Sequence, residues 1–137
     1  MIRKAYSSDA KFIFETLAKT LTPWEEQGIL GSIEHDLVFI LEGEGVIIAR
    51  QTLDELEILN FAVKKELRGQ GYGKSLLGFL LDHAEKSGVK TAFLDVRQSN
   101  IAAVSLYKSF GFEICGKRKN YYRNPPEDAV LMNLNIN

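Results

Sequence analysis

The stretch LEILNFAVKKELRGQGYGKSLLGFLL, residues 56–81, decides the fold. It opens with an apolar run over residues 56–63, which predicts a buried strand. A glycine-rich turn follows at residues 68–74, and leucines then recur at helical spacing at Leu76, Leu77, Leu80 and Leu81. A helix that starts from such a turn has first amides without internal partners, and its dipole favours an anion there. The turn therefore indicates a phosphate-bearing ligand.

Three glycine motifs compete for this turn. A Walker A loop requires a glycine five positions before Gly73, where this chain has Arg68. The dinucleotide fingerprint Gly-x-Gly-x-x-Gly lacks its last glycine whether it starts at Gly69 or at Gly71. What remains is Arg-x-x-Gly-x-Gly, ending at Gly73. The alternative is a tight turn that binds no ligand.

The elements on either side of this stretch give the fold class. Upstream, Ile2–Tyr6 predicts a strand, Ser8 and Asp9 can cap a helix, and Thr22-Pro23-Trp24-Glu25 predicts a second helix start with Thr22 as its N-cap. The remaining predicted elements are strands at 37–41 and 46–49, a strand at 91–96, a helix at 100–110, and strands at 112–115 and 129–134. The order predicts an α/β or α+β sheet with helices on both faces.

Length and charge restrict the function further. The 137 residues fit a single domain, residues 1–137. Seventeen basic and 18 acidic residues give a net charge of -1, so we expect neither nucleic acid nor a membrane as partner. Cys115 is the only cysteine, and nothing near His35 or His83 has metal-ligand spacing, so we expect no metal. No apolar run approaches the roughly 20 residues that span a bilayer, and we expect a cytoplasmic protein.

Several segments carry a resemblance to a known family. They are Leu59–Val63 before the turn, LDVRQSN at 94–100, AAVSLYKSFGF at 102–112, Asn120-Tyr121-Tyr122, and Glu127-Asp128-Ala129. With the turn, they resemble the N-acetyltransferases of the GNAT superfamily over residues 56–134. Together the segments resemble one branch of that superfamily, the ribosomal-protein-alanine N-acetyltransferases, and the Asn-Tyr-Tyr segment is the most selective of them. This branch is close to the catalytic subunits of protein N-terminal acetyltransferases.

This resemblance implies a fold and a co-substrate. The GNAT fold has a mixed, mostly antiparallel sheet whose fourth and fifth strands run parallel and splay apart around acetyl-CoA. Here these would be residues 56–63 and 91–97. The residues implied to bind acetyl-CoA are Phe61, Ala62, Val63, Arg68, Gly69, Gln70, Gly71, Tyr72, Gly73, Lys74, Ser75, Asn100 and Tyr107.

The resemblance also implies catalytic residues. Tyr107 matches the family's general acid, although it could be a core residue. Asp95 stands where bacterial relatives have glutamate, and its shorter side chain would reach the amine through a water molecule. Asp95 alternates with apolar neighbours, so a raised pKa would suit it as a base. The alternative is an ion pair with a nearby base such as Arg97 or Lys90. Glu57 is the second candidate base, or a solvated strand residue.

Aromatic residues are the candidates for acceptor binding. Tyr121 and Tyr122 resemble residues that frame a substrate peptide, and strand alternation predicts that only one of them contacts it. Trp24 is a third candidate, with a core role as its alternative. The basic cluster Lys117, Arg118, Lys119 and Arg123 either steers CoA phosphates or an acidic partner, or is a solvated hairpin.

The resemblance thus implies acetyl transfer from acetyl-CoA to an amine, foremost the N-terminal α-amine of a protein such as a ribosomal protein. Two alternatives are a GNAT enzyme for a free small amine (an amino acid, polyamine or drug) and a non-catalytic CoA-binding module. ATP hydrolysis at a Walker-type loop is a remote further alternative. We expect a monomer or a homodimer.

Overall fold

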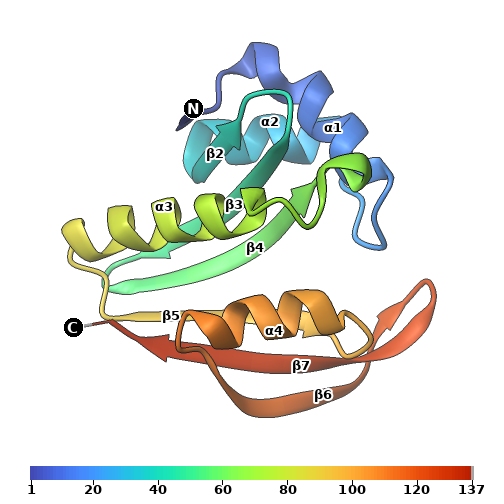
Figure 1. The fold of residues 1–137 in the computed structure, drawn as a ribbon, viewed down its shortest axis with the longest axis vertical. Helices are drawn as coiled ribbons and strands as arrows, with labels where there is room; N and C mark the ends of the chain where they lie inside the picture. Colours follow the sequence, from blue (N-terminus) through green and yellow to red (C-terminus); the bar gives the residue numbers. More distant parts are fainter. Residues whose placement is uncertain (137) are drawn as a thin grey trace.

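In the computed structural model, which describes residues 1–136, seven strands form one mixed sheet in the order β1-β2-β3-β4-β5-β7-β6 (Figure 1). The strands are β1 Ile2–Lys4, β2 Leu37–Leu41, β3 Gly45–Thr52, β4 Glu55–Val63, β5 Thr91–Arg97, β6 Glu113–Arg123 and β7 Pro126–Asn135. Every neighbouring pair is antiparallel except β4 and β5, which are parallel. The predicted mixed sheet with parallel fourth and fifth strands is confirmed.

Helices cover both faces of this sheet. They are α1 Ala10–Ala18, α2 Glu26–His35, α3 Tyr72–Lys86 and α4 Ile101–Ser109, with short 3-10 turns at Ser7–Asp9 and Lys65–Leu67. Buried residues of α1 and α2 share one core cluster, and those of α3 and α4 share the other. The sheet therefore separates two cores. None of the helices within residues 1–136 is both long and apolar enough to cross a membrane.

Strands β2 and β3 explain why the sheet needs both layers. In β2, Phe39 and Leu41 pack in the core of α3 and α4, whereas Val38 and Ile40 pack in the core of α1 and α2. Successive strand residues point to opposite faces, so a strand buried on both faces is apolar at every position. This is the reason that residues 37–41 read as a continuous apolar run.

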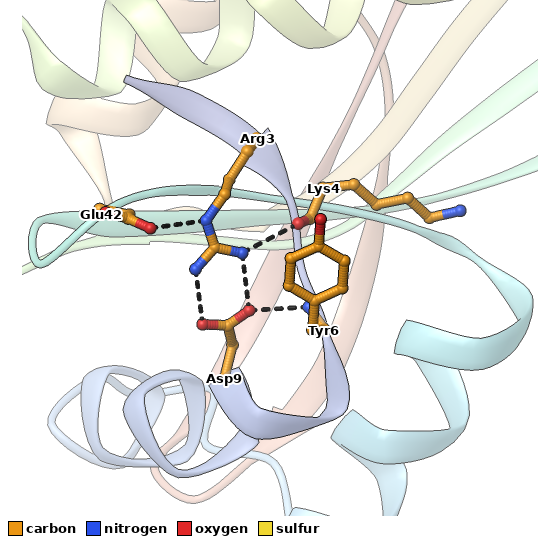
Figure 2. Close-up of polar contacts among 5 residues, drawn as sticks. All are labelled: Arg3, Lys4, Tyr6, Asp9 and Glu42. Carbon is orange, nitrogen blue, oxygen red and sulfur yellow. Dashed lines mark hydrogen bonds and ion pairs between the residues drawn. The ribbon is translucent and has the colours of Figure 1, made fainter.

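An arginine ties β1 to the start of the first helical segment. The Arg3 guanidinium donates to both carboxylate oxygens of Asp9, each at 2.9 Å, and to Glu42 Oε1 at 2.6 Å (Figure 2). Asp9 also accepts the backbone N–H of Tyr6 at 2.7 Å. Asp9 therefore caps the 3-10 turn that precedes α1. The Arg3 hydrogen bond holds the pKa of the Asp9 carboxyl below its ordinary value.

Several predicted boundaries are wrong: β1 ends at Lys4, β3 continues to Thr52 and β7 begins at Pro126, and two larger differences concern α2 and β6. Helix α2 begins at Glu26 with Glu25 as its N-cap, so Thr22 caps no helix. The Thr22 hydroxyl instead donates to Asn60 Oδ1 at 3.3 Å, and this bond ties the loop between α1 and α2 to β4. Strand β6 continues to Arg123, well beyond the predicted end at Cys115. As an edge strand it carries charged residues in place of an apolar signal.

Candidate active site

An opening between β4 and β5 is the central feature of the site. Residues 55–58 of β4 pair with residues 91–94 of β5, and beyond them the two strands do not pair with each other (Figure 1). A cavity of about 870 Å³ occupies this region and is lined by residues of both strands. Because the backbone groups that face the opening lack partners from the opposite strand, they are available to a ligand.

A β-bulge at Leu59 changes which side chains of β4 pack in the core of α3 and α4. Ile48 of β3 pairs with Asn60, whereas the next residue, Ala49, pairs with Ile58, so β4 has one extra residue. Such a bulge shifts the alternation of side chains by one position. Before it, Ile58 packs in the core of α3 and α4; after it, Phe61 does so. The bulge therefore directs Phe61 and the strand end toward α3.

The glycine-rich turn lies at one end of the cavity. Gly69 and Gly71 have φ values of 80° and 87°, and Gly71 is the N-cap of α3. Glycine adopts such angles without strain. The first residues of α3, 72–74, line the cavity, and their amides have no partner inside the helix. The start of α3 is the positive end of the helix dipole, so this part of the cavity wall suits an anion.

The predicted residues of this turn divide into two groups. Six of them line the cavity: Arg68, Gly69, Gly71, Tyr72, Gly73 and Lys74. Gln70 and Ser75 do not, and the Ser75 hydroxyl donates back to the Gly71 carbonyl at 3.1 Å. The Arg68 Nε donates to the Val63 carbonyl at 3.2 Å, so it joins the turn to the end of β4. Phe61, Ala62 and Val63 also line the cavity.

Helix α4 contributes Tyr107 and Asn100 to the wall. Tyr107 is 5% exposed, lines the cavity, and packs edge-on against Phe112 with ring centroids 5.4 Å apart. Burial raises the pKa of its phenol, with a smaller contribution from Tyr122, so the hydroxyl stays protonated near neutral pH. Asn100 lines the cavity as the N-cap of α4, and its Oδ1 accepts the Ala103 N–H at 3.1 Å.

Two carboxylates line the other face of the opening. Glu57 pairs in register with Phe93, and Asp95 follows two residues later on β5, so both carboxylates share one face of the sheet. The alternative considered for Asp95, an ion pair with a nearby base, is formed with Arg118 and not with Arg97 or Lys90. Asp95 Oδ1 lies 3.6 Å from Arg118 Nε, and the Asp95 side chain is 20% exposed. Within residues 1–136, Glu57 makes no side-chain hydrogen bond or ion pair.

Both tyrosines of the Asn-Tyr-Tyr segment line the cavity, and the predicted alternation is wrong. Four positions separate Arg118 from Tyr122 on β6, against two between their partners on β7, so β6 bulges here. Asn120 has a φ of 53°, and its N–H donates to Asp128 Oδ1 at 2.8 Å. The two tyrosine rings meet edge to face at 5.1 Å. Burial, and then Asp95, raise the pKa of Tyr122 to about 12.

The loop between α1 and α2 closes the remaining side. Trp24 lines the cavity and also packs against the core of α1 and α2, so both of its predicted placements occur together. The buried Asn60 donates through Nδ2 to the Thr22 carbonyl at 2.8 Å, and its Oδ1 accepts the Phe61 N–H at 2.8 Å. Asn60 therefore fixes this loop to β4, a role that no local sequence signal indicates.

The basic cluster of β6 lies outside the cavity lining. Lys117 Nζ approaches Asp128 at 3.9 Å and Arg118 pairs with Asp95. The cationic side chains that do line the cavity near the turn are Arg68 and Lys74. The cavity lining thus includes the cationic turn and the start of α3, the carboxylates Glu57 and Asp95, and two further cationic side chains, Lys19 and Arg97.

A parallel strand pair that separates around such a cavity defines a class of protein, the acyltransferases that take their acyl group from a coenzyme A thioester. The lining of this cavity brings together the first residues of α3, the buried Tyr107 and the carboxylates Glu57 and Asp95.

Comparison with known proteins agrees with this class. Residues 3–112 match the acetyltransferase (GNAT) family, and the chain belongs to that family. It is therefore an acetyl-CoA-dependent N-acetyltransferase. It is 40% identical over 121 residues to the [ribosomal protein bS18]-alanine N-acetyltransferase of Escherichia coli K12, covering 83% of this chain and 82% of that protein. The protein of the same name from Haemophilus ducreyi is 36% identical over 143 residues, covering 98% and 99% of the two chains.

The solved structures give the same family. The crystal structure of the ribosomal-protein-S18-alanine N-acetyltransferase from Escherichia coli superposes with a TM-score of 0.91 and 35% identity. The match covers 99% of this chain and 93% of that one.

Proposed function

We propose that this enzyme acetylates the N-terminal α-amine of a protein, and that its acceptor is a ribosomal protein that begins with alanine. The cavity between β4 and β5 carries the proposal, because its lining combines the glycine-rich turn and the start of α3 with the carboxylates Glu57 and Asp95. The helix start suits the diphosphate of acetyl-CoA, and the two carboxylates suit a positively charged amine. The named activity of two relatives supports the choice of acceptor.

We assign donor binding to the turn and the strand end. The first amides of α3 bind the diphosphate, with Arg68 and Lys74 as charge partners. The backbone of Phe61 and Val63 binds the pantetheine arm and the acetyl carbonyl, while Asn100 contacts the arm from the start of α4. Acetyl-CoA supplies the acetyl group and a thiolate leaving group. Ser75 supports the turn through its hydrogen bond to the Gly71 carbonyl, and Gln70 has no binding role in this assignment because it lies outside the lining.

We assign the two proton transfers to opposite faces of the sheet. Asp95 takes the proton from the acceptor ammonium, through a water molecule, after Arg118 has moved away from it. Glu57 shares that face and is the alternative base. Tyr107 gives its hydroxyl proton to the leaving sulfur, and its raised pKa keeps that proton in place until transfer.

We assign acceptor binding to Tyr121, Tyr122 and Trp24, which line the cavity. Tyrosine and tryptophan provide wide apolar contact with a polar edge, which suits an extended peptide backbone. Burial raises the pKa of the Tyr122 phenol, and Asp95 lies close enough to raise it as well, which supports a peptide N-terminus directed at Asp95. A cytoplasmic location is part of this proposal, since a ribosomal protein is made there.

The test is incubation with acetyl-CoA and a matched panel of acceptors, with release of free thiol as the signal. The panel contains peptides that begin with alanine, the same peptides with a blocked α-amine, and free amino acids and polyamines. Thiol release that requires an alanine peptide with a free α-amine supports the proposal. Release with free small amines alone contradicts the acceptor assignment.

A further inference from the structure

Arg97, at the end of β5, connects segments that are distant in the sequence. The residue is 6% exposed, and all four N–H bonds of its terminal nitrogens are used. Nη1 donates to the Pro125 carbonyl at 2.9 Å and to Glu127 Oε1 at 3.3 Å. Nη2 donates to the carbonyls of Asn124 at 3.1 Å and Leu21 at 3.2 Å. One guanidinium thus bonds to both the loop after α1 and the turn between β6 and β7.

These two segments are the walls of the acceptor side of the cavity. The loop at residues 19–24 supplies Trp24 to the lining, and the β6–β7 hairpin supplies Tyr121 and Tyr122. The Tyr122 ring lies under the Arg97 guanidinium, with 4.3 Å between the guanidinium carbon and the ring centroid. The position of one wall relative to the other, and the position of this ring, therefore depend on one side chain.

We propose that Arg97 is a positioning residue for the acceptor, which sets the spacing between the two walls and holds the Tyr122 ring at the cavity. The proposal rests on the proposed function, because it assigns that face to the acceptor peptide. Arg97 acts through the walls and takes no part in the proton transfers.

The chemistry of the contact requires an arginine. A planar guanidinium directs its donors to several acceptors at fixed angles, whereas a lysine ammonium has three donors on a flexible stem. Stability alone does not explain the arrangement. A buried ion pair such as that of Arg97 with Glu127 contributes little net stability. The buried Arg97 Nε also has no partner within residues 1–136, which is unfavourable for folding.

The experiment compares Arg97→Lys with a matched control, Arg50→Lys. Like Arg97, Arg50 uses its guanidinium in several hydrogen bonds. It donates to the two Asp36 carboxylate oxygens at 2.9 and 3.1 Å, and it does not line the cavity. For Arg97→Lys we expect the KM for an alanine peptide to rise about tenfold to a hundredfold, the loss that one or two charge-assisted hydrogen bonds represent. The affinity for acetyl-CoA and the values for Arg50→Lys should stay within about twofold of wild type.

Hydrogen exchange gives a readout that does not depend on activity. Arg97→Lys should speed exchange in residues 19–25 and 120–126 and leave residues 69–75 unchanged. Glu127→Gln removes the charge partner of Arg97 and keeps the carbonyl contacts, so it replaces Arg97→Lys if that variant does not fold. It should speed exchange in residues 19–25, which Glu127 reaches only through Arg97.

The outcomes separate this inference from the proposed function. Unchanged exchange in residues 19–25 in the folded variant would overturn the positioning role. Equal losses for peptide and acetyl-CoA would also overturn it, because the effect would then be general. If the wild type acetylates no peptide, the proposed function fails, and the exchange pattern still decides whether Arg97 couples the two walls.

Discussion

Replacing Tyr107 with phenylalanine removes one oxygen atom from the cavity wall and leaves the ring in place. The ring keeps its contacts with Phe112 and Phe61, whose centroids lie 5.4 and 6.2 Å away. Within residues 1–136 the Tyr107 hydroxyl makes no hydrogen bond, so the free energy of unfolding should change by less than about 1 kcal/mol. Any large loss of activity therefore reports on chemistry and not on folding.

The expected loss follows from the proposed role of this hydroxyl. A positioned general acid contributes about 10²–10⁴-fold to a rate, or roughly 3–5 kcal/mol of barrier. We expect Tyr107→Phe to lower kcat by this factor while the affinity for acetyl-CoA stays within about twofold. Because burial raises the Tyr107 pKa, the wild-type hydroxyl is protonated at both pH 6 and pH 9, and the factor should be similar at both.

The assay is thiol release at a saturating concentration of alanine peptide, with acetyl-CoA binding followed by calorimetry. Tyr6→Phe is the control, since Tyr6 is 64% exposed and outside the cavity lining. Wild-type turnover in Tyr107→Phe would refute the acid role. A loss of turnover that matches a loss of acetyl-CoA affinity would refute it as well.

Three further outcomes are expected. Asp95→Asn should lower turnover near neutral pH by about 10²–10³-fold, and Glu57→Gln by far less, as measured by thiol release; the opposite ranking moves the base to β4. Gly71→Ala puts a Cβ on a backbone with a φ of 87° but creates no clash, since nothing lies within 4 Å of it. The left-handed backbone then costs about 1–2 kcal/mol. If the turn leaves this conformation, the affinity for acetyl-CoA measured by calorimetry should fall about tenfold. Unchanged affinity would separate the turn from the diphosphate. Arg3 lowers the pKa of Asp9, so the Arg3–Asp9 contact stabilises the folded protein. This contribution is present above about pH 3.8 and is lost as the pH falls through the lowered pKa. The free energies of urea unfolding of wild type and Asp9→Asn should therefore differ at pH 7, and the difference should shrink as the pH falls below 3.8; a difference that does not shrink in acid would contradict the assignment.

The sequence predicted the elements that have strong local signals. Strand β2 has the predicted bounds at residues 37–41, because a strand buried on both faces has an unbroken apolar run. Helix α4 starts from Asn100 as expected, since an asparagine followed by a helical pattern is a local capping signal. The glycine-rich turn also joins a strand to a helix as predicted, with residues 72–74 forming the start of α3.

The features that shape the acceptor side could not be predicted in this way. The bulges at Leu59 and near Asn120 depend on the register of the partner strands, which no local pattern contains. The Arg97 contacts reach Leu21, 76 residues away in the sequence, and three of the four hydrogen bonds end on backbone carbonyls, which every residue possesses. Thr22 carries a valid capping signal, but a hydrogen bond to Asn60 from another element takes its place.

Amide chemical shifts of labelled protein during a titration with acetyl-CoA test the central claim most directly. We predict the largest changes at the amides of residues 69–75 and at Phe61 and Val63, with smaller changes along α4 from Asn100 to Tyr107. Binding that leaves the amides of residues 69–75 unchanged, or shifts confined to the β6 basic cluster, would contradict the placement of the diphosphate at the turn and of the thioester between β4 and β5.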